Sequence, residues 1–179
     1  MGSDPGLYDL ADRVGHKLRA AERRIATAES CTGGWVAKAL TDVPGSSHWF
    51  ECGYVTYSNA AKMRDLGVAA RTLDSFGAVS EQTVREMAEG VMRISAATVA
   101  LAVSGIAGPD GGTPGKPVGL VWFCATARQG AAIDIIAEEK LFNGDREFVR
   151  IRSVEHALRL ILRLDLPVRL ESPPRAGAA

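Results

Sequence analysis

A loop of sequence SCTGG at residues 30–34 follows the apolar run at residues 25–28. When a strand runs into Ser-x-Thr-Gly-Gly and then into a helix, backbone N–H groups and the hydroxyls of Ser30 and Thr32 point at one place. A helix N-terminus carries unsatisfied donors and partial positive charge, so this place suits an anion, usually a phosphate. A tight turn that caps a helix is the simpler interpretation of the same residues. The candidate ligand-binding residues here are Ser30, Thr32, Gly33 and Gly34.

A second group, formed by Ser47, Tyr57 and Lys62, is typical of nucleophilic chemistry. A serine hydroxyl needs a neighbouring base, and His48 is poorly placed because adjacent strand residues face opposite ways. A lysine held neutral by burial could serve instead. Ser47 and Lys62 flank opposite ends of the predicted strand at residues 49–57, which separates them by roughly 30 Å if the strand is straight. A bend in the strand or a partner subunit would be needed to bring them together.

Two further features could bind a ligand. Ser104 and Gly105 end an apolar strand and open a Gly/Pro-rich loop, and α/β folds usually bind ligands at strand carboxyl ends. Arg146, in the segment Asn-Gly-Asp-Arg, opens the last predicted helix and has a guanidinium that can fork onto a phosphate or carboxylate. A surface arginine in a turn is the alternative interpretation of Arg146.

Composition and charge exclude several classes of protein. Lys plus Arg total 21 and Asp plus Glu total 21, so the charge balance does not favour nucleic-acid or membrane partners. The N-terminal segment lacks the features of a signal peptide, and we expect a cytoplasmic protein. The three cysteines are widely spaced and form no C-x-x-C pair, so neither a zinc site nor a disulfide framework is indicated. We expect no metal and no cofactor. Cys31 could be a catalytic thiol, but a small filler residue is the interpretation we prefer.

Alternation of helical and strand patterns predicts a layered α/β domain with a mixed sheet. We expect helices at residues 7–22, 33–40, 59–66, 81–94 and 148–164, and strands at residues 25–28, 49–57, 99–103, 118–127 and 131–142. The last two strands form a hairpin around residues 129–130, which makes part of the sheet antiparallel. We expect one domain over residues 1–168, followed by a disordered tail at residues 169–179.

In order along the chain, the motifs resemble those of the CinA C-terminal domain family, whose stand-alone members include nicotinamide-nucleotide amidohydrolases. The resemblance covers about residues 10–164 and is carried by TAESCTGG (27–34), PGSS (44–47), GYVTYSNAAK (53–62), GAVS (77–80), SGIAGPDGG (104–112), KPVG (116–119) and NGDR (143–146). No motif position departs from the family pattern. The resemblance implies a three-layer α/β/α sandwich and hydrolysis of nicotinamide mononucleotide (NMN) to nicotinic acid mononucleotide and ammonia.

The resemblance also implies roles for individual residues. Ser47 matches the nucleophile of a metal-free serine–lysine mechanism, Lys62 its base and Tyr57 an accessory group. The positions that match ligand-binding residues are Ser30, Thr32, Ser104, Gly105 and Arg146. We expect a homo-oligomer without a cofactor. Two alternatives stay open at this point, a non-catalytic nucleotide-binding or oligomeric module of the same family, and a hydrolase that acts on another amide or on a phosphoester.

Overall fold

The computed structural model of the chain describes residues 5–167, which form a five-stranded mixed sheet. The strands are β1 (Ile25–Glu29), β2 (Phe50–Val55), β3 (Val99–Gly105), β4 (Leu120–Gln129) and β5 (Ala132–Leu141), in the spatial order β2-β1-β3-β4-β5. β1 pairs in parallel with both β2 and β3, while β4 pairs antiparallel with β3 and with β5. The predicted mixed sheet and its terminal hairpin are confirmed.

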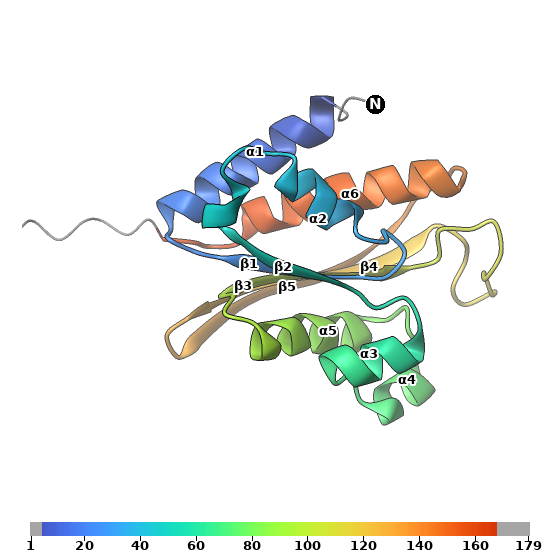
Figure 1. The fold of residues 1–179 in the computed structure, drawn as a ribbon. Helices are drawn as coiled ribbons and strands as arrows, with labels where there is room; N and C mark the ends of the chain where they lie inside the picture. The colour runs from blue at the N-terminus through green and yellow to red at the C-terminus, as the bar shows by residue number, and fades with distance from the viewer. Residues whose placement is uncertain (1–4, 168–179) are drawn as a thin grey trace, which may run out of the picture.

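Helices cover both faces of this sheet and make the three-layer α/β/α sandwich that the family resemblance implied (Figure 1). The helices are α1 (Pro5–Ala20), α2 (Trp35–Thr41), α3 (Asn59–Leu66), α4 (Ala70–Phe76), α5 (Glu81–Ile94) and α6 (Arg146–Arg163), with a short 3-10 turn η1 at Ser46–His48. α1, α2 and α6 lie on one face of the sheet, and α3, α4 and α5 lie on the other (Figure 1).

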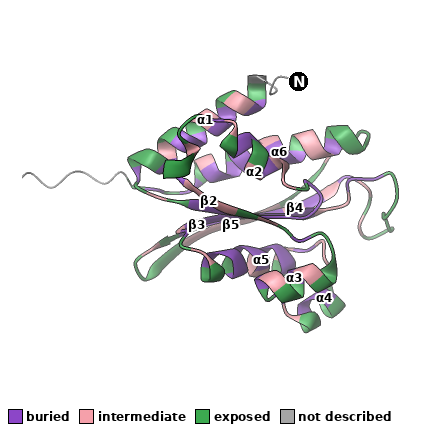
Figure 2. Ribbon diagram, viewed as in Figure 1, coloured by how far each residue is buried: buried purple, intermediate pink, exposed green. Residues whose placement is uncertain are grey.

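The alternation of side chains along the central strands divides the core in two. Ile25 and Leu101 face α1 and α6, whereas Ala26 and Ala102 face α5. All four are fully buried, as expected for parallel strands covered on both sides. Figure 2 shows the buried residues concentrated in the sheet and on the inward sides of the helices. The two layers of helices therefore cover the faces of the sheet. The ends of the strands stay uncovered, and a ligand-binding site can form there.

The crossover connections place a topological switch at β1. The chain leaves β1 through α2 to reach β2 on one side, and it leaves β2 through α3, α4 and α5 to reach β3 on the other side. The registers align Glu29, the last residue of β1, with Val55 of β2 and Val103 of β3. The carboxyl ends of three parallel strands thus meet at one edge, which is where ligands bind in open α/β sheets.

Two parts of the chain differ from the expected secondary structure. The strand expected from residue 49 begins at Phe50, because residues 46–48 form η1 instead. The helix α4 was not expected from the sequence. Its first turn is held from a distance, since the Glu86 carboxylate on α5 accepts hydrogen bonds from the Ala69 N–H and the Thr72 hydroxyl, at 2.7 and 2.6 Å. The expected disordered tail at residues 169–179 lies outside the described residues.

Candidate active site at the carboxyl ends of the parallel strands

The amine of Lys62 is buried against the end of β1. Ser58 caps α3 by accepting a hydrogen bond from the Ala61 N–H at 3.1 Å, which starts the helix so that Lys62 lies in its first turn. Only 1% of Lys62 is exposed. Its Nζ donates to Ser30 Oγ at 3.1 Å, to the Thr56 carbonyl at 2.7 Å and to the Tyr57 carbonyl at 3.4 Å. The structure therefore pairs Lys62 with a serine on another loop.

The surroundings of this amine favour its neutral form. All three of its acceptors are uncharged oxygens. Burial disfavours the ammonium ion and lowers the pKa of Lys62 from 10.5 to about 8. A lysine with such a pKa is partly neutral near pH 7, and a neutral amine within hydrogen-bonding distance of a hydroxyl can remove its proton. The arrangement can thus activate the Ser30 hydroxyl.

The thiol of the neighbouring Cys31 is unreactive. Cys31 follows Ser30 directly and is buried, with 5% exposed. Burial raises the pKa of the Cys31 thiol to about 12. Because the thiolate is the reactive form, a thiol with this pKa is a poor nucleophile. This supports the interpretation of Cys31 as a small filler residue.

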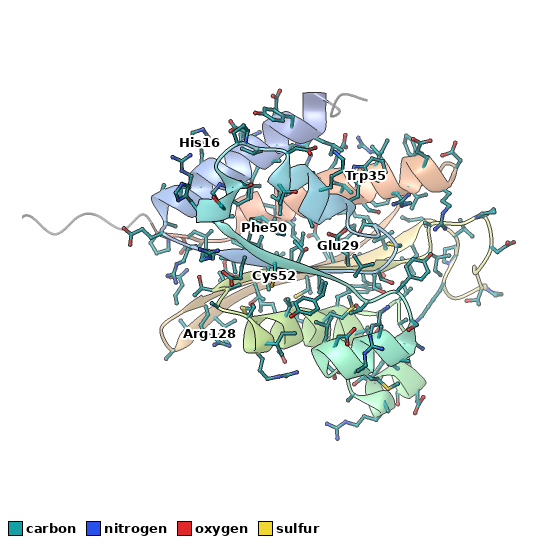
Figure 3. All side chains as sticks on the ribbon, viewed as in Figure 1. His16, Glu29, Trp35, Phe50, Cys52 and Arg128 are labelled. Carbon is teal, nitrogen blue, oxygen red and sulfur yellow. The ribbon has the colours of Figure 1, made fainter. Side chains whose placement is uncertain are left out.

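The N-terminus of α2 is occupied by the protein itself. The Glu29 carboxylate accepts hydrogen bonds from the backbone N–H groups of Gly34, Val36 and Ala37 at 3.0, 3.1 and 2.8 Å. Glu29 is 1% exposed and lies between the sheet and α2 (Figure 3). An internal carboxylate therefore satisfies these three donors of the helix N-terminus, which the sequence had suggested for a phosphate. Sequence analysis missed this role of Glu29, although an acid just before a helix-opening Gly-Gly is a recognisable signal.

The rest of the SCTGG loop is held from α6. Arg150 donates from Nε to the Cys31 carbonyl at 3.2 Å and from Nη2 to the Thr32 carbonyl at 2.9 Å. Gly33 and Gly34 have φ values of 63° and 90°, a left-handed backbone that favours glycine. The Thr32 side chain is fully buried, and its hydroxyl has no hydrogen-bond partner among residues 5–167. Arg150 is a second residue that sequence analysis missed, because nothing local marks a helix residue that reaches a distant loop.

Ser47 lies at the other end of β2. It is exposed and belongs to η1, before the strand begins, whereas the Lys62 amine contacts the Thr56 carbonyl just after the strand ends. β2 is extended over 6 residues, which puts roughly 20 Å between its two ends. The register with β1 shifts once, next to Ile25, and this irregularity does not fold the strand back. The expected pair of Ser47 with Lys62 is therefore not formed within the chain.

Arg146 contacts the side chain of Tyr57, whose backbone carbonyl accepts a hydrogen bond from Lys62. Arg146 donates from Nη2 to the Tyr57 hydroxyl at 3.1 Å and from Nη1 to the Gly108 carbonyl at 2.8 Å. Asp145 starts α6 by accepting a hydrogen bond from the Phe148 N–H at 2.8 Å. Both Tyr57 and Arg146 are exposed, so unused N–H groups of the guanidinium can reach an anion. The structure thus joins the end of β2, the Gly/Pro-rich loop and α6.

Ser104 and Gly105 have structural roles in this chain. The Ser104 hydroxyl is 1% exposed and donates to the Ala78 carbonyl at 2.7 Å, which ties the end of β3 to the segment before α5. A Cβ on Gly105 would lie 2.6 Å from Val121 Cγ2, so only glycine allows β3 and β4 to approach here. The Ser104 hydroxyl has thus given its hydrogen to the Ala78 carbonyl, and its oxygen keeps acceptor capacity.

Residues 5–167 contain neither a metal-binding cluster nor a membrane-spanning helix. No group of three or more His, Cys, Asp or Glu side chains is placed to hold a metal ion in this part of the chain. None of the helices in the same range is long and apolar enough to cross a membrane.

The CinA C-terminal domain model matches residues 7–164. The chain belongs to the CinA C-terminal domain family. "Nicotinamide-nucleotide amidohydrolase PncC" of Enterobacter agglomerans is 50% identical over 161 residues, which is 90% of this chain and 96% of that relative. The Escherichia coli K12 protein of the same name is 48% identical over 159 residues, covering 89% of this chain and 94% of the relative. The competence/damage inducible protein CihA from Agrobacterium tumefaciens has a crystal structure that is 42% identical, covers 90% of this chain and 98% of its own, and gives a TM-score of 0.86.

Most motifs of this CinA C-terminal domain gather at one edge of the sheet. Residues 27–34, 53–62, 77–80, 104–112 and 143–146 meet there through the contacts of Lys62, Ser104 and Arg146. The segment at residues 44–47 is separate, because it precedes β2 and lies at the opposite edge. The segment at residues 44–47 is therefore left without a role in the site around Lys62.

Proposed function

We propose that this chain hydrolyses the carboxamide of NMN to give nicotinic acid mononucleotide and ammonia, with Ser30 as nucleophile and Lys62 as base. The names of relatives that are about 50% identical over 90% of the chain support the substrate and the reaction. The observation that carries the residue assignment is the 3.1 Å contact between Lys62 Nζ and Ser30 Oγ. It replaces the sequence-based choice of Ser47 as nucleophile.

The reaction is an acyl transfer in two halves. The neutral Lys62 amine removes the Ser30 proton while the serine oxygen bonds to the carboxamide carbon. The resulting ammonium of Lys62 then gives its proton to the departing nitrogen, the C–N bond breaks, and ammonia leaves. In the second half Lys62 removes a proton from water and the hydroxide attacks the ester carbon. The bond from that carbon to the serine oxygen then breaks, Lys62 returns its proton to Ser30, and the acid product leaves.

Backbone and side-chain donors around the dyad complete the proposed site. The N–H groups of the turn that follows Ser30 hold the oxyanion, since Arg150 and Glu29 fix this turn from both sides. Arg146 binds the nucleotide phosphate, in place of the α2 N-terminus that Glu29 occupies. The Tyr57 hydroxyl accepts from Arg146 and aims its guanidinium.

Ammonia release from NMN by two serine variants tests this proposal. Ser30→Ala should lower kcat by about 10³-fold or more, because it removes the nucleophile. Ser47→Ala is the matched control, since Ser47 is an exposed serine in the same chain, and its rate should stay close to that of the unsubstituted protein. An active Ser30→Ala variant together with an inactive Ser47→Ala variant would instead identify Ser47 as the nucleophile. Wild-type protein that binds NMN without releasing ammonia would favour the non-catalytic nucleotide-binding module instead.

Assembly offers one route by which Ser47 could act. We retain from the sequence the proposal that the chain forms a homo-oligomer, in which the Ser47 of one subunit could approach the Lys62 of another. Mixing Ser47→Ala with Lys62→Ala protein tests this, because a shared site would regain activity in mixed oligomers. If no activity returns and Ser47→Ala alone is active, each chain carries a complete Ser30–Lys62 dyad.

A further inference from the structure

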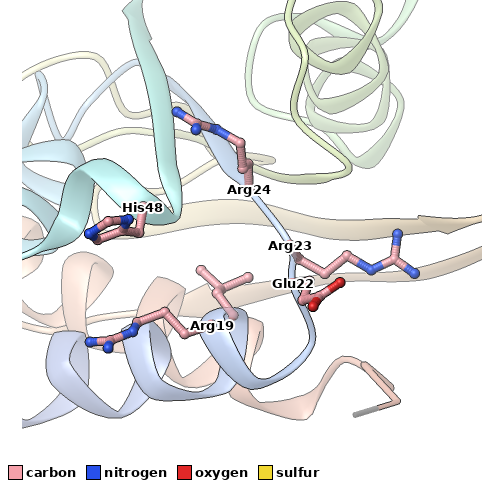
Figure 4. Close-up of a pocket in the computed structure, with 6 residues that line it drawn as sticks. Arg19, Glu22, Arg23, Arg24 and His48 are labelled. Atoms are coloured by element: carbon pink, nitrogen blue, oxygen red, sulfur yellow. The ribbon is translucent and has the colours of Figure 1, made fainter. Parts of the chain in front are cut away.

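A basic pocket lies at the end of the sheet opposite the Lys62 amine. It has a volume of about 460 Å³ and is lined by Leu18, Arg19, Glu22, Arg23, Arg24 and His48 (Figure 4). Three arginines and a histidine face one glutamate there, in a chain whose net charge is +0. Residues 23–24 precede β1 and His48 precedes β2, so the pocket sits at the amino ends of these strands. A local excess of positive charge attracts anions.

Close packing fixes two walls of this basic pocket. Trp49 is 1% exposed, and a Cβ on Gly15 would lie 2.8 Å from its ring, so glycine is needed for α1 and η1 to approach. The Ile25 N–H also donates to the Trp49 carbonyl at 2.8 Å. Arg19 lies one helical turn after Gly15, and His48 is adjacent to Trp49. Arg19 and His48 are therefore presented by elements that are locked together.

The arginine side chains at the end of α1 are not needed to satisfy the last carbonyl groups of that helix. The carbonyls of Leu18 and Arg19 already accept backbone N–H groups from Arg23 and Glu22, at 2.9 and 3.0 Å. Glu22 has a φ of 52°, and no other residue except glycine has a positive φ among residues 5–167. Such a conformation is costly for a residue with a side chain, and strained residues are often kept at functional sites. This turn is what directs residues 23–24 to the pocket.

Existing contacts orient two of the arginines without using all of their donors. Arg24 pairs through Nε with the Glu51 carboxylate at 2.5 Å and donates from Nη2 to the Phe50 carbonyl at 3.2 Å. Arg23 donates from Nη1 to the Arg128 carbonyl at 3.1 Å. Each guanidinium has five N–H groups, so both keep donors for a ligand. Glu51 offsets the charge of Arg24, and Glu22 offsets one more, so the three arginines leave an excess of one positive charge with His48 neutral.

Arg19 and His48 are available for a ligand. No hydrogen bond or ion pair engages either side chain within the part of the chain that the structure describes. In Figure 4, Arg19, Arg24 and His48 lie along one side of the pocket, while Glu22 and Arg23 project toward the other side. The side away from Glu22 therefore carries two guanidiniums and an imidazole from different elements, and the guanidinium of Arg24 is paired with Glu51.

We propose that this pocket binds a small molecule that carries a di- or triphosphate group. The forked guanidinium matches the oxygens of a phosphate, and cations placed on separate elements suit more than one anionic group. The volume of about 460 Å³ lies within the usual range for small-molecule sites. The proposal also places the ligand next to the segment at residues 44–47, which directly precedes His48 and does not itself line the pocket. It does not depend on the proposed reaction.

Calorimetric titration of the full chain with inorganic pyrophosphate, at physiological ionic strength, tests this binding. Arg19→Gln should weaken the affinity about tenfold or more, because a charge-assisted hydrogen bond is lost from an exposed side chain that supports no core packing. Arg13→Gln is the matched control, since Arg13 is an exposed arginine of the same helix outside the pocket, and its affinity should be unchanged. Equal affinities of wild type and Arg19→Gln would overturn the proposal, as would undetectable binding to the wild type.

Two further titrations distinguish binding in the basic pocket from binding at the Lys62 site, and a nucleotide from a free diphosphate. Arg146→Gln should bind pyrophosphate as the wild type does, and loss of binding in this variant alone would move the ligand to the Lys62 site and overturn the proposal. A parallel titration with ATP distinguishes a nucleotide from a free diphosphate, and the proposal predicts that Arg19→Gln weakens whichever of the two binds. The circular dichroism spectrum and the urea unfolding midpoint of Arg19→Gln should match those of the wild type, which shows that the variant is folded whether or not the chain releases ammonia.

Discussion

The Lys62 amine lies 3.1 Å from the Ser30 hydroxyl oxygen, although 32 residues separate the two along the chain. Ser30 follows β1, and Lys62 lies in the first turn of the helix after β2. The parallel pairing of these strands brings their carboxyl ends together, and Glu29 stands opposite Val55 in the register. A serine and a buried lysine are thus joined by the sheet and not by local sequence.

Activity should depend on the protonation of Lys62. Because burial lowers the pKa of Lys62 to about 8, the neutral base becomes more abundant as the pH rises toward that value. We expect kcat/KM for ammonia release to rise about tenfold per pH unit below about pH 7 and to level off above about pH 8. Lys62→Arg should be almost as inactive as Lys62→Ala, because a guanidinium keeps its proton. A pH-independent rate, or an active Lys62→Arg variant, would contradict the role of Lys62 as base. It would indicate that Lys62 holds the substrate through its positive charge.

The same amine should make stability depend on pH. The pKa of Lys62 is about 8 in the folded chain against 10.5 for an ordinary lysine, so between these values the unfolded chain binds more protons. The free energy of unfolding should therefore rise with pH across this window, by about 2 kcal/mol once solvent screening is allowed for. Urea unfolding of wild type and Lys62→Met over the window measures the effect. Lys62→Met should lack this contribution, and parallel curves for the two proteins would contradict it.

Glu29 should act as a positioning residue for the SCTGG loop. Glu29→Gln keeps the shape of the side chain but sets an amide N–H₂ against backbone N–H donors of α2, which should cost about 1–3 kcal/mol of stability. We expect kcat to fall while KM for NMN changes little, because Arg146 still binds the phosphate. The pH at which the rate levels off should stay near that of the wild type, since Lys62 is untouched. A large shift of that pH would instead give Glu29 a direct role in proton transfer.

The hydroxyl of Tyr57 should matter for binding more than for chemistry. Tyr57→Phe removes the acceptor for Arg146 Nη2 and leaves the ring, so the guanidinium loses one of its two anchors. We expect KM for NMN to rise by up to about tenfold with kcat nearly unchanged. Arg146→Gln should raise KM further because the positive charge itself is lost. A fall in kcat with unchanged KM in Tyr57→Phe would place the hydroxyl at the reacting atoms.

Local patterns were enough for most of the framework. The apolar run at β1, the helical periodicity of α1, α5 and α6, and the hairpin of β4 and β5 are local properties, and the structure confirms them. The helix α4 was not predicted, because residues far from it along the chain stabilise it. The Glu86 carboxylate that holds its first turn belongs to α5, at 17 residues from Ala69 along the chain. A short helix that is supported from a distance leaves no periodic signal of its own.

Local sequence is enough to indicate which residue types could do chemistry here, namely a serine near a Gly-Gly turn, a lysine behind a strand and an arginine at a helix start. Which of these residues meet depends on the pairing of the strands. Ser47 is nearer to Lys62 in sequence, but an extended strand holds the two apart, while strand pairing delivers Ser30 to the same amine. The charge state of Lys62 was decided in the same way, because desolvation comes from elements that pack around it and not from its neighbours in sequence.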